Sequence, residues 1–217
     1  MLALDIKSVL QPGSRVLCIG AHCDDIEIGC GGSMLKWLAS STDIHVDWLV
    51  LSGSEVRDRE ALTSAAIFLR DAASSEIIIK SFRNGFFPAV LADLKMYFED
   101  IKQRPAPDLI LTHYRHDLHQ DHRVVNELTW NTFRNHLILE YEIPKYDGDL
   151  GQPNVYVEID QPTADAKITA LMDSFASERD KNWFDERTFH AMLRLRGVEC
   201  QSVGGLAEAF HGRKILI

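Results

Sequence analysis

The chain has 217 residues, enough for one large domain with an extensive core. Its formal net charge of −9 and isoelectric point of about 5.4 argue against nucleic acid or an anionic membrane surface as a partner. The four cysteines form no C-x-x-C pair or disulfide framework, and the sequence shows neither a signal-peptide pattern nor an apolar run of about 18 residues. These features predict a cytoplasmic protein without a membrane span.

Short apolar runs alternate with amphipathic stretches along the first half of the chain. Four of the runs predict buried strands, at Arg15–Gly20, Val46–Ser52, Glu76–Lys80 and Asp108–Thr112. The stretches between them predict helices at Gly32–Ser40, Val56–Arg70 and Val90–Gln103. This alternation predicts an α/β fold with a Rossmann-like, mostly parallel sheet and helices on both faces.

The second half of the chain continues the mixture of helices and strands. We expect a helix from about Asp121 to Asn135, strands at Leu137–Pro144 and Asn154–Ile159, and helices at Thr163–Ser177 and Asp185–Arg196. The segment Tyr146–Pro153 reads as a loop near the site. Because no internal repeat, low-complexity tract or convincing linker interrupts the sequence, residues 1–217 are expected to form a single domain.

Two polar motifs directly follow the first and the fourth predicted strands. They are Ala21–Glu27 (AHCDDIE) and His113–His122 (HYRHDLHQDH). In open α/β sheets, ligands bind at the carboxyl ends of the strands, where the strand order reverses. A strand order beginning 3-2-1-4 makes the first and fourth strands neighbours. It therefore brings six polar side chains into one crevice: His22, Asp24, Asp25, His119, Asp121 and His122.

The residue types in this crevice are those of a catalytic metal site. Neutral imidazoles and carboxylates are usual ligands of catalytic zinc, which takes three protein groups and leaves one open position. Any one of these histidines alone reads as readily as a loop residue or a helix cap. Asp24 and Asp25 could also cap a helix N-terminus, a role that is compatible with metal binding. The combination of both motifs at neighbouring strand ends predicts a metal centre.

The two motifs resemble those of the LmbE-like or PIG-L-type N-acetylglucosaminyl deacetylases. The pattern of that family is A-H-P-D-D-x-E, then G-x-G-G, and later a histidine-rich stretch ending in H-x-D-H. The corresponding segments here are Ala21–Glu27, Gly29–Gly32 and His119–His122. The resemblance extends over nearly the whole chain through four further segments: Arg57–Glu60 (R-x-x-E), Pro107-Asp108, Asn154–Ile159 and Ala207–Phe210.

This resemblance implies a zinc-dependent N-deacetylase with one zinc ion per chain, acting on an N-acetylated amino sugar or its conjugate. It implies that His22, Asp25 and His122 hold the zinc. Asp24 would be the general base that takes a proton from the zinc-bound water. His119 would stabilise the oxyanion or protonate the leaving amine, and Asp121 would orient His119 and favour its charged form.

Three positions depart from the family pattern. Cys23 replaces the usual proline, and we expect its thiol to pack beneath the loop rather than bind metal. Phe175–Glu178 occurs where many members carry H-x-S-Q, and Asn84 lies in a loop where many carry an acidic residue. Arg57 and Asn84 are nevertheless predicted to contact substrate, against the alternatives of a surface ion pair and a plain Asn-Gly turn. These departures leave the identity of the substrate undetermined, but they do not change the predicted metal ligands.

Two other functions fit parts of the same pattern. A metal-dependent phosphoesterase normally needs two metals about 4 Å apart, with more bridging carboxylates than this chain supplies. A non-catalytic zinc-binding scaffold favours four protein ligands, most often cysteines. Asp24 and His119, which are not needed as ligands, favour an enzyme acting on a small molecule. The oligomeric state and the native metal stay open, because iron, cobalt or nickel can occupy the same ligands.

Overall fold

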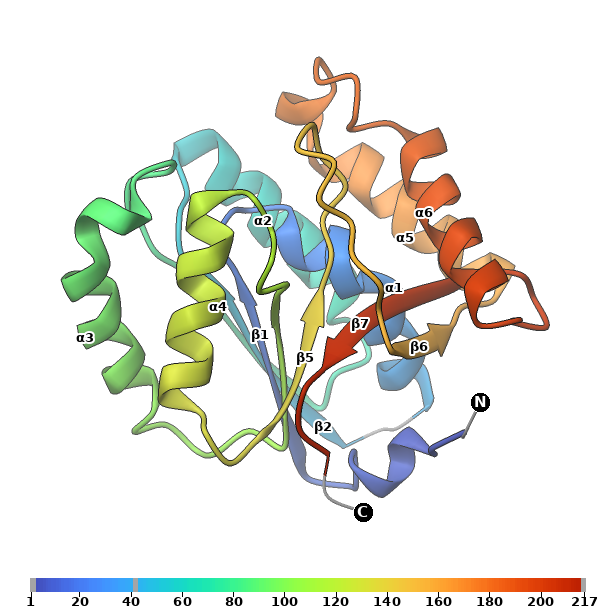
Figure 1. Cartoon of the computed structure of the whole chain (residues 1–217), viewed down its shortest axis with the longest axis horizontal. Helices are drawn as coiled ribbons and strands as arrows, with labels where there is room; N and C mark the ends of the chain where they lie inside the picture. Colours follow the sequence, from blue (N-terminus) through green and yellow to red (C-terminus); the bar gives the residue numbers. More distant parts are fainter. Residues whose placement is uncertain (1–2, 41–42, 216–217) are drawn as a thin grey trace.

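A computed structural model describes residues 3–40 and 43–215, and within these ranges one mixed sheet runs through the molecule (Figure 1). Its strands are β1 (Ser14–Gly20), β2 (Ile44–Val50), β3 (Ser74–Ile79), β4 (Leu109–His113), β5 (Leu137–Tyr141), β6 (Val155–Glu158) and β7 (Ala207–Gly212). Their order is β3-β2-β1-β4-β5-β7-β6, and the first five are parallel. The predicted order 3-2-1-4 and the mostly parallel sheet are therefore confirmed.

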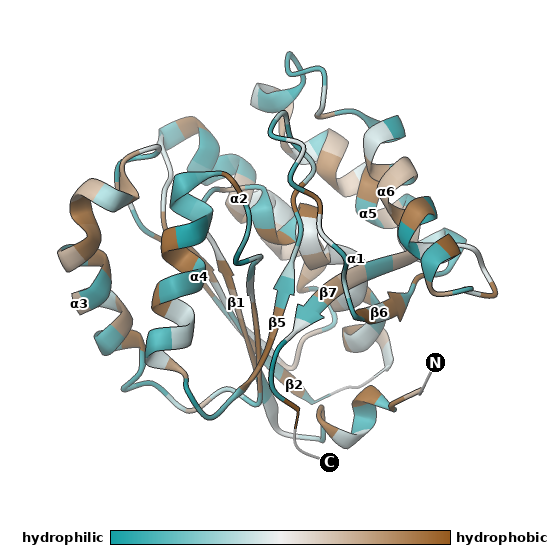
Figure 2. Ribbon diagram, viewed as in Figure 1, coloured by the Kyte–Doolittle hydropathy of each residue, from teal (hydrophilic) through white to brown (hydrophobic). Residues whose placement is uncertain are grey.

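Helices cover both faces of the sheet. They are α1 (Asp25–Ser40), α2 (Glu55–Phe68), α3 (Leu91–Ile101), α4 (Gln120–Thr132), α5 (Gln161–Ser174) and α6 (Glu186–Glu199), with short 3-10 helices η1 (Ile6–Ser8), η2 (Phe87–Val90) and η3 (Ala176–Glu178). Helices α3 and α4 pack together on one face, and α1, α2, α5 and α6 lie on the other (Figure 1). The central strands are largely hydrophobic, whereas the helices carry hydrophilic residues on their outer surfaces (Figure 2).

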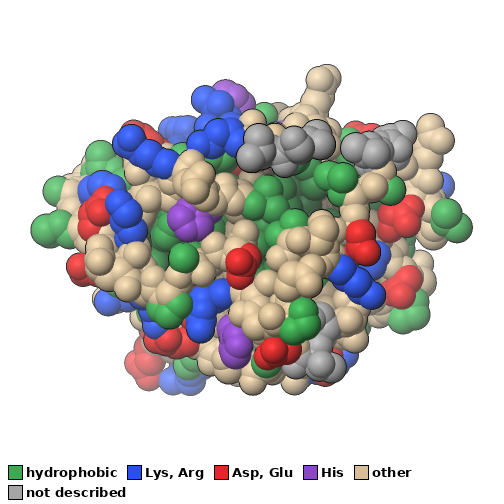
Figure 3. Space-filling view, turned by 90° about the horizontal axis from the view of Figure 1, so that it is seen from below, with side chains coloured by type: hydrophobic (Ala, Val, Ile, Leu, Met, Phe, Trp, Pro, Cys, Tyr) green, Lys and Arg blue, Asp and Glu red, His purple; other side chains and the backbone are tan. Residues whose placement is uncertain are grey.

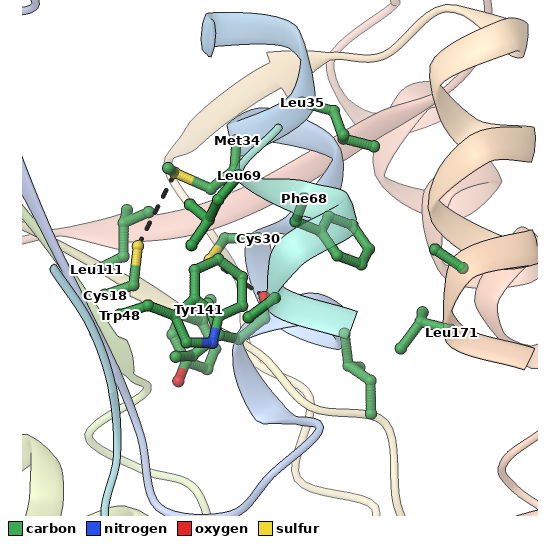
Figure 4. Packing of buried hydrophobic residues seen from close by; sticks show 14 of the residues in the cluster. Cys18, Cys30, Met34, Leu35, Trp48, Phe68, Leu69, Leu111, Tyr141 and Leu171 are labelled. Carbon is green, nitrogen blue, oxygen red and sulfur yellow. Dashed lines mark hydrogen bonds between the residues drawn. The ribbon is translucent and has the colours of Figure 1, made fainter. Parts of the chain in front are cut away.

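The core fills the two layers between the sheet and these helices. On the α1 side, Trp48 from β2 stacks on Phe68 from α2, and the thiol of Cys18 lies 3.9 Å from the sulfur of Met34 (Figure 4). The four cysteines are buried and free. Acidic and basic side chains are interspersed over the face seen from below (Figure 3). Within residues 3–40 and 43–215, each helix is too short or too polar to cross a membrane.

Helix α1 begins seven residues before the predicted start at Gly32, because its glycines serve close packing rather than a helix end. A Cβ atom at Gly29 would collide with the Tyr141 ring, and one at Gly31 would collide with Phe68. Glycine in a helix interior costs about 1 kcal/mol relative to alanine. Here that cost is offset by the close packing of α1 against the sheet and against α2. Because the helix starts this early, Asp25 lies in its first turn.

Strand β7 was not predicted as a strand, and it enters the sheet antiparallel between β5 and β6. It is bonded to α1 through Glu208, whose carboxylate accepts hydrogen bonds from the backbone N–H groups of Gly32 (2.8 Å) and Ser33 (2.6 Å). The Lys167 ammonium, buried on α5, donates both to Glu208 and to the carbonyl of Ile28 at 2.6 Å. A buried ion pair thus joins α1, α5 and β7.

Candidate active site

The two predicted motifs meet where β1 and β4 end side by side. The first forms the β1–α1 turn, which is closed by a 2.6 Å hydrogen bond from the backbone N–H of His22 to the Asp25 carboxylate. The second forms the β4–α4 turn, where His119 is the N-cap of α4 and its Nδ1 accepts the N–H of Asp121 at 3.2 Å. The turns bring the side chains predicted to form a metal centre into contact across about a hundred residues of sequence.

Three donor atoms converge between these turns. Nδ1 of His22 lies 3.1 Å from Nε2 of His122 and 3.3 Å from Oδ2 of Asp25, and the His122 nitrogen lies 3.5 Å from Oδ1 of Asp25. Ligands about 2.0–2.2 Å from a tetrahedral zinc ion are about 3.3–3.6 Å from one another. The separations of 3.1–3.5 Å, measured to the two different oxygens of Asp25, lie close to this range, and the N/N/O chemistry of the three residues suits a single metal ion.

A fourth residue, His113 at the end of β4, also lies in this cluster and was given no role from the sequence. Together with Asp25 and His122 it forms one of the two overlapping groups that could hold a metal within residues 3–40 and 43–215, the other being His22, His119 and His122. However, Nε2 of His113 accepts the backbone N–H of Ala21 at 2.9 Å, which occupies its lone pair. Its ring stacks on His122 with 3.9 Å between centroids. His113 is therefore placed to support His122 rather than to coordinate.

Asp117 is a second residue that sequence reasoning missed. Its carboxylate accepts Nδ1–H of His122 at 2.8 Å, which fixes the tautomer that presents Nε2 to the cluster. It also accepts the backbone N–H of His119 at 2.8 Å and contacts the Lys145 ammonium at 2.9 Å. In the sequence, the role of Asp117 as a partner of the site is indicated by its position alone, two residues before His119 and five before His122.

The electrostatics of the cluster are those of a cation site. Burial would lower the pKa of His22, but Asp25 and Asp121 outweigh it and raise this pKa to about 10. Burial, reinforced by His113, lowers the pKa of His122 to about 3. Burial opposes ionisation of Asp25, yet the surrounding imidazoles hold its pKa well below the usual range. The carboxylates around His22 therefore favour a positive charge at its position, whereas the His122 imidazole is neutral.

Asp24, the predicted base, points to the α2 side of the site. Burial raises its pKa, and the Arg57 guanidinium, 3.0 Å away, opposes that shift. Arg57 also contacts Glu178 at 3.0 Å and Glu60 at 3.4 Å. Glu60 in turn accepts both the backbone N–H and the hydroxyl of Ser177. The R-x-x-E segment thus links the base to η3, and Arg57 is already engaged by three carboxylates.

His119 and Asp121 are brought together, but not in the arrangement expected from the resemblance. In the described part of the chain, the Asp121 carboxylate accepts the N–H groups of Gly85 (2.6 Å) and Phe87 (3.0 Å) and contacts Nε2 of His22 at 3.3 Å, without a bond to the His119 ring. The reason is that Asp121 lies in the first turn of α4 and faces the loop before η2. Burial and the charge of His22 lower the pKa of His119, which argues against a resting imidazolium.

A pocket of about 370 Å³ opens over this cluster. Its walls include Asp24, Arg57, Asn84 and Glu178, and its outer part is formed by Lys145, Tyr146, Asp147, Lys181 and Trp183. Arg57 and Asn84, both predicted to contact substrate, thus line the pocket. Cys23 is 1% exposed, and its thiol contacts the carbonyl of Ser52 at 3.4 Å, which confirms the expectation that it packs beneath the loop.

The doubly wound α/β fold places N/O metal donors and a buried carboxylate at the carboxyl edge of the sheet, a combination that fits a metal-dependent hydrolase. The profile of the PIG-L family, described as GlcNAc-PI de-N-acetylase, matches residues 17–133, more than half of the chain. The chain therefore belongs to the PIG-L (LmbE-like) family of deacetylases, as its motifs predicted.

Individual relatives agree with this family assignment. The "uncharacterized deacetylase YaiS" of Escherichia coli K12 is 28% identical over 167 residues, covering 72% of this chain and 88% of the relative. The fold is shared with N,N'-diacetylchitobiose deacetylase of Pyrococcus horikoshii (TM-score 0.71, 19% identity, 96% of this chain and 87% of that one). It is also shared with the 4-carboxy-2-hydroxymuconate hydratase GalB of Pseudomonas putida (TM-score 0.68, 16% identity, 94% of this chain and 98% of that one). Because a hydratase has the same fold, the reaction must be argued from the site.

Proposed function

We propose that this protein is a zinc-dependent N-deacetylase that removes an acetyl group from an amino sugar or from a conjugate of one. The observation that carries the proposal is the grouping of His22, Asp25 and His122 near the spacing of metal ligands, with a further buried carboxylate, Asp24, next to Asp25 in the chain and ion-paired with Arg57. The family and the relatives that are deacetylases support the same reaction.

In this proposal His22, Asp25 and His122 hold one zinc ion. When bound, the metal would supply Lewis acidity: it would polarise the amide carbonyl and lower the pKa of water, so that water could lose a proton and attack the carbonyl near neutral pH. The chain contributes the surroundings: His122 is fixed in one tautomer by Asp117, and the turn that carries His22 and Asp25 is closed by a backbone hydrogen bond. Ligands held in this way are oriented before the metal arrives.

Asp24 and His119 would handle the protons. Asp24 is placed as the base that takes a proton from the attacking water: burial raises its pKa, which suits a proton acceptor, and the Arg57 guanidinium 3.0 Å away opposes that rise. His119, whose ring centroid lies 4.8 Å from that of His22, would stabilise the oxyanion; because its pKa is lowered, it would deliver a proton to the leaving amine only after taking one up during the reaction. The Asp121 carboxylate would act through its contact with His22, and the backbone N–H of Asp121, which donates to Nδ1 of His119, would orient the His119 ring.

The pocket walls would bind the sugar. Asn84 offers an amide that can pair with a hydroxyl group, and Arg57 lies on the wall beside the base. The walls carry charges of both signs together with the rings of Tyr146 and Trp183, a combination that suits a polar ring joined to a less polar substituent. We therefore favour a conjugated amino sugar over an unsubstituted one.

The proposal is tested by measuring bound metal and amine release on the same preparation. Purified protein is analysed for zinc and then incubated with N-acetylated amino sugars and their conjugates, with a fluorogenic amine reagent as readout. We expect one metal per chain and amine release that disappears in Asp24→Asn, which keeps the size of the side chain and the metal ligands. Metal binding without amide hydrolysis on any member of the panel would overturn the deacetylase proposal. The absence of metal after reconstitution would overturn the metal centre itself.

A further inference from the structure

Lys145 lies beside the pocket in the loop between β5 and β6, and its ammonium group is fully engaged. Nζ lies 2.9 Å from the Asp117 carboxylate, 2.5 Å from that of Asp149 and 3.3 Å from the carbonyl of Ile143. An ammonium has three protons, so no donor is left for a substrate. Although Lys145 lines the pocket, its contacts point to a different task.

The three charged groups form a buried set. The side chains of Lys145, Asp117 and Asp149 are 9%, 1% and 5% exposed, respectively. Buried charges are costly unless they are paired and hydrogen-bonded, and removing one partner of such a set costs more than the pair itself contributes. Asp149 also accepts the backbone N–H of Leu118 at 2.6 Å, so both carboxylates hold the β4–α4 turn on either side of Leu118.

This set leads directly to a predicted metal ligand. The Asp117 oxygen that contacts Lys145 is the one that accepts Nδ1–H of His122. The other Asp117 oxygen accepts the backbone N–H of His119. Lys145 therefore opposes any movement of the one carboxylate that orients both His122 and the start of α4.

We propose that Lys145 is a positioning residue for the metal centre, acting on His122 through Asp117. Its ammonium holds the Asp117 carboxylate against His122 and balances the charges of Asp117 and Asp149. The same contacts fasten the loop that carries Tyr146 and Asp147 to the β4–α4 turn, so the outer wall of the pocket and the metal ligands share one anchor. This inference rests on the proposed metal centre, but not on the identity of the substrate.

The test is the zinc affinity of full-length protein, measured without substrate by competition with a chelating indicator. Lys145→Met removes the charge and keeps the length of the side chain, and we expect its affinity to fall about 10- to 100-fold, the usual cost of disturbing the partner of a ligand histidine. Lys145→Arg should lie closer to wild type, because it restores the charge. Lys102→Met makes the same change at an exposed position after α3 and should leave the affinity unchanged.

A second measurement separates positioning from folding. The visible spectrum of bound Co²⁺ reports the ligand geometry, and the thermal unfolding of metal-free protein reports the fold. We expect Lys145→Met to change the spectrum while the metal-free protein still unfolds cooperatively. If that variant does not fold, Lys145→Gln, which keeps two N–H donors without the charge, is measured instead.

The possible results bear differently on the two proposals. Zinc affinity and Co²⁺ spectrum equal to wild type in the neutral variant, or an equal loss in Lys145→Arg, would overturn the role of Lys145. Zinc binding with the expected losses but no amide hydrolysis would support Lys145 and overturn only the deacetylase proposal. Wild-type protein that binds no divalent metal would overturn both.

Discussion

The two sides of the pocket are built in different ways. The metal-facing side, formed by the β1–α1 and β4–α4 turns, consists of side chains that hold one another: His122 is 2% exposed and contacts Asp25, Asp117 and His113. The pocket rim, formed by Asn84, Tyr146, Asp147, Lys181 and Trp183, lies on loops, and Tyr146 is 70% exposed. A change on the metal-facing side disturbs several partners at once, whereas a change on the rim disturbs few. Reaction and specificity can therefore vary separately in this fold.

The largest effect is expected at Asp25, the carboxylate of the predicted ligand set. Asp25→Ala removes one ligand and the acceptor that closes the β1–α1 turn, so bound zinc and amine release should both fall to background. Metal analysis and the amine assay measure this directly. Asp43→Ala, an exposed aspartate before β2, is the matched control and should keep both. Zinc retained at wild-type stoichiometry in Asp25→Ala would show that the metal uses another ligand set.

Arg57 pairs with Asp24 and also lines the pocket, so kinetic measurements can decide whether it serves catalysis or substrate binding. If it holds Asp24, Arg57→Met should lower kcat about 100-fold with little change in KM, because small displacements of a reacting group have effects of that order. Arg57→Lys keeps the charge and should lose less. The measurement is the separate determination of kcat and KM at constant metal content. A raised KM with unchanged kcat would instead assign Arg57 to substrate binding, as predicted from the sequence.

On the metal-facing side, Glu27 is the residue whose burial is expected to lower the stability of the metal-free protein. It is fully buried, neither carboxylate oxygen has a hydrogen-bond partner among the described residues, and burial raises its pKa to about 8. A carboxyl group whose pKa is higher in the folded than in the unfolded chain costs stability as pH rises from its unfolded pKa, near 4.5, towards 8. Glu27→Gln should therefore stabilise metal-free protein by about 4 kcal/mol at pH 8 and by very little at pH 4.5.

Urea unfolding of metal-free wild type and Glu27→Gln at the two pH values measures this difference. Glu55→Gln, at the exposed start of α2, controls for the loss of one carboxylate. An equal effect at both pH values would mean that Glu27 is ionised throughout, with a partner outside the contacts described above.

The smallest effect is expected on the rim. Asn84→Ala removes one uncharged hydrogen-bonding group, so KM should rise about 2- to 10-fold with kcat nearly unchanged. Asn84→Asp restores the acidic side chain that many family members carry in this loop. Comparing both variants over several amino-sugar conjugates checks whether the substitution selects among substrates. A loss of kcat as large as that of Arg57→Met would place Asn84 with the catalytic groups and break the division between the two sides.

Much of the parallel half of the sheet was predictable, because its strands are short apolar runs separated by amphipathic helices. The antiparallel insertion of β7 was not, since Ala207–Gly212 (AEAFHG) mixes small, polar and aromatic residues whose burial depends on neighbours distant in sequence. The early start of α1 was missed because Gly29, Gly31 and Gly32 disfavour a helix locally. They are explained by close contacts with Tyr141, Phe68 and Glu208, respectively.

The candidate site shows the same limit. His22, Asp25 and His122 could be predicted because each lies in a compact motif at the end of a predicted strand. Lys145 and Asp149 could not, because they reach the second motif from a loop whose path no local pattern specifies. The contact of Asp121 with Gly85 and Phe87, instead of the His119 ring, likewise depends on how two loops pack. Motifs identify the groups that meet, and tertiary packing decides how they meet.

The ion pair between Lys167 and Glu208 has a consequence for the order of events during synthesis. Both metal motifs are complete once residue 122 has been made, but the helix that carries Asp25 receives its bonds from Glu208 much later. Contacts this distant in sequence form late and slow folding, and a growing chain is extended by only about 5–20 residues per second. A nascent chain therefore displays its histidines and carboxylates for several seconds before α1 is fixed. If the proposed metal centre exists, we therefore expect the finished chain to bind metal more tightly than the emerging one.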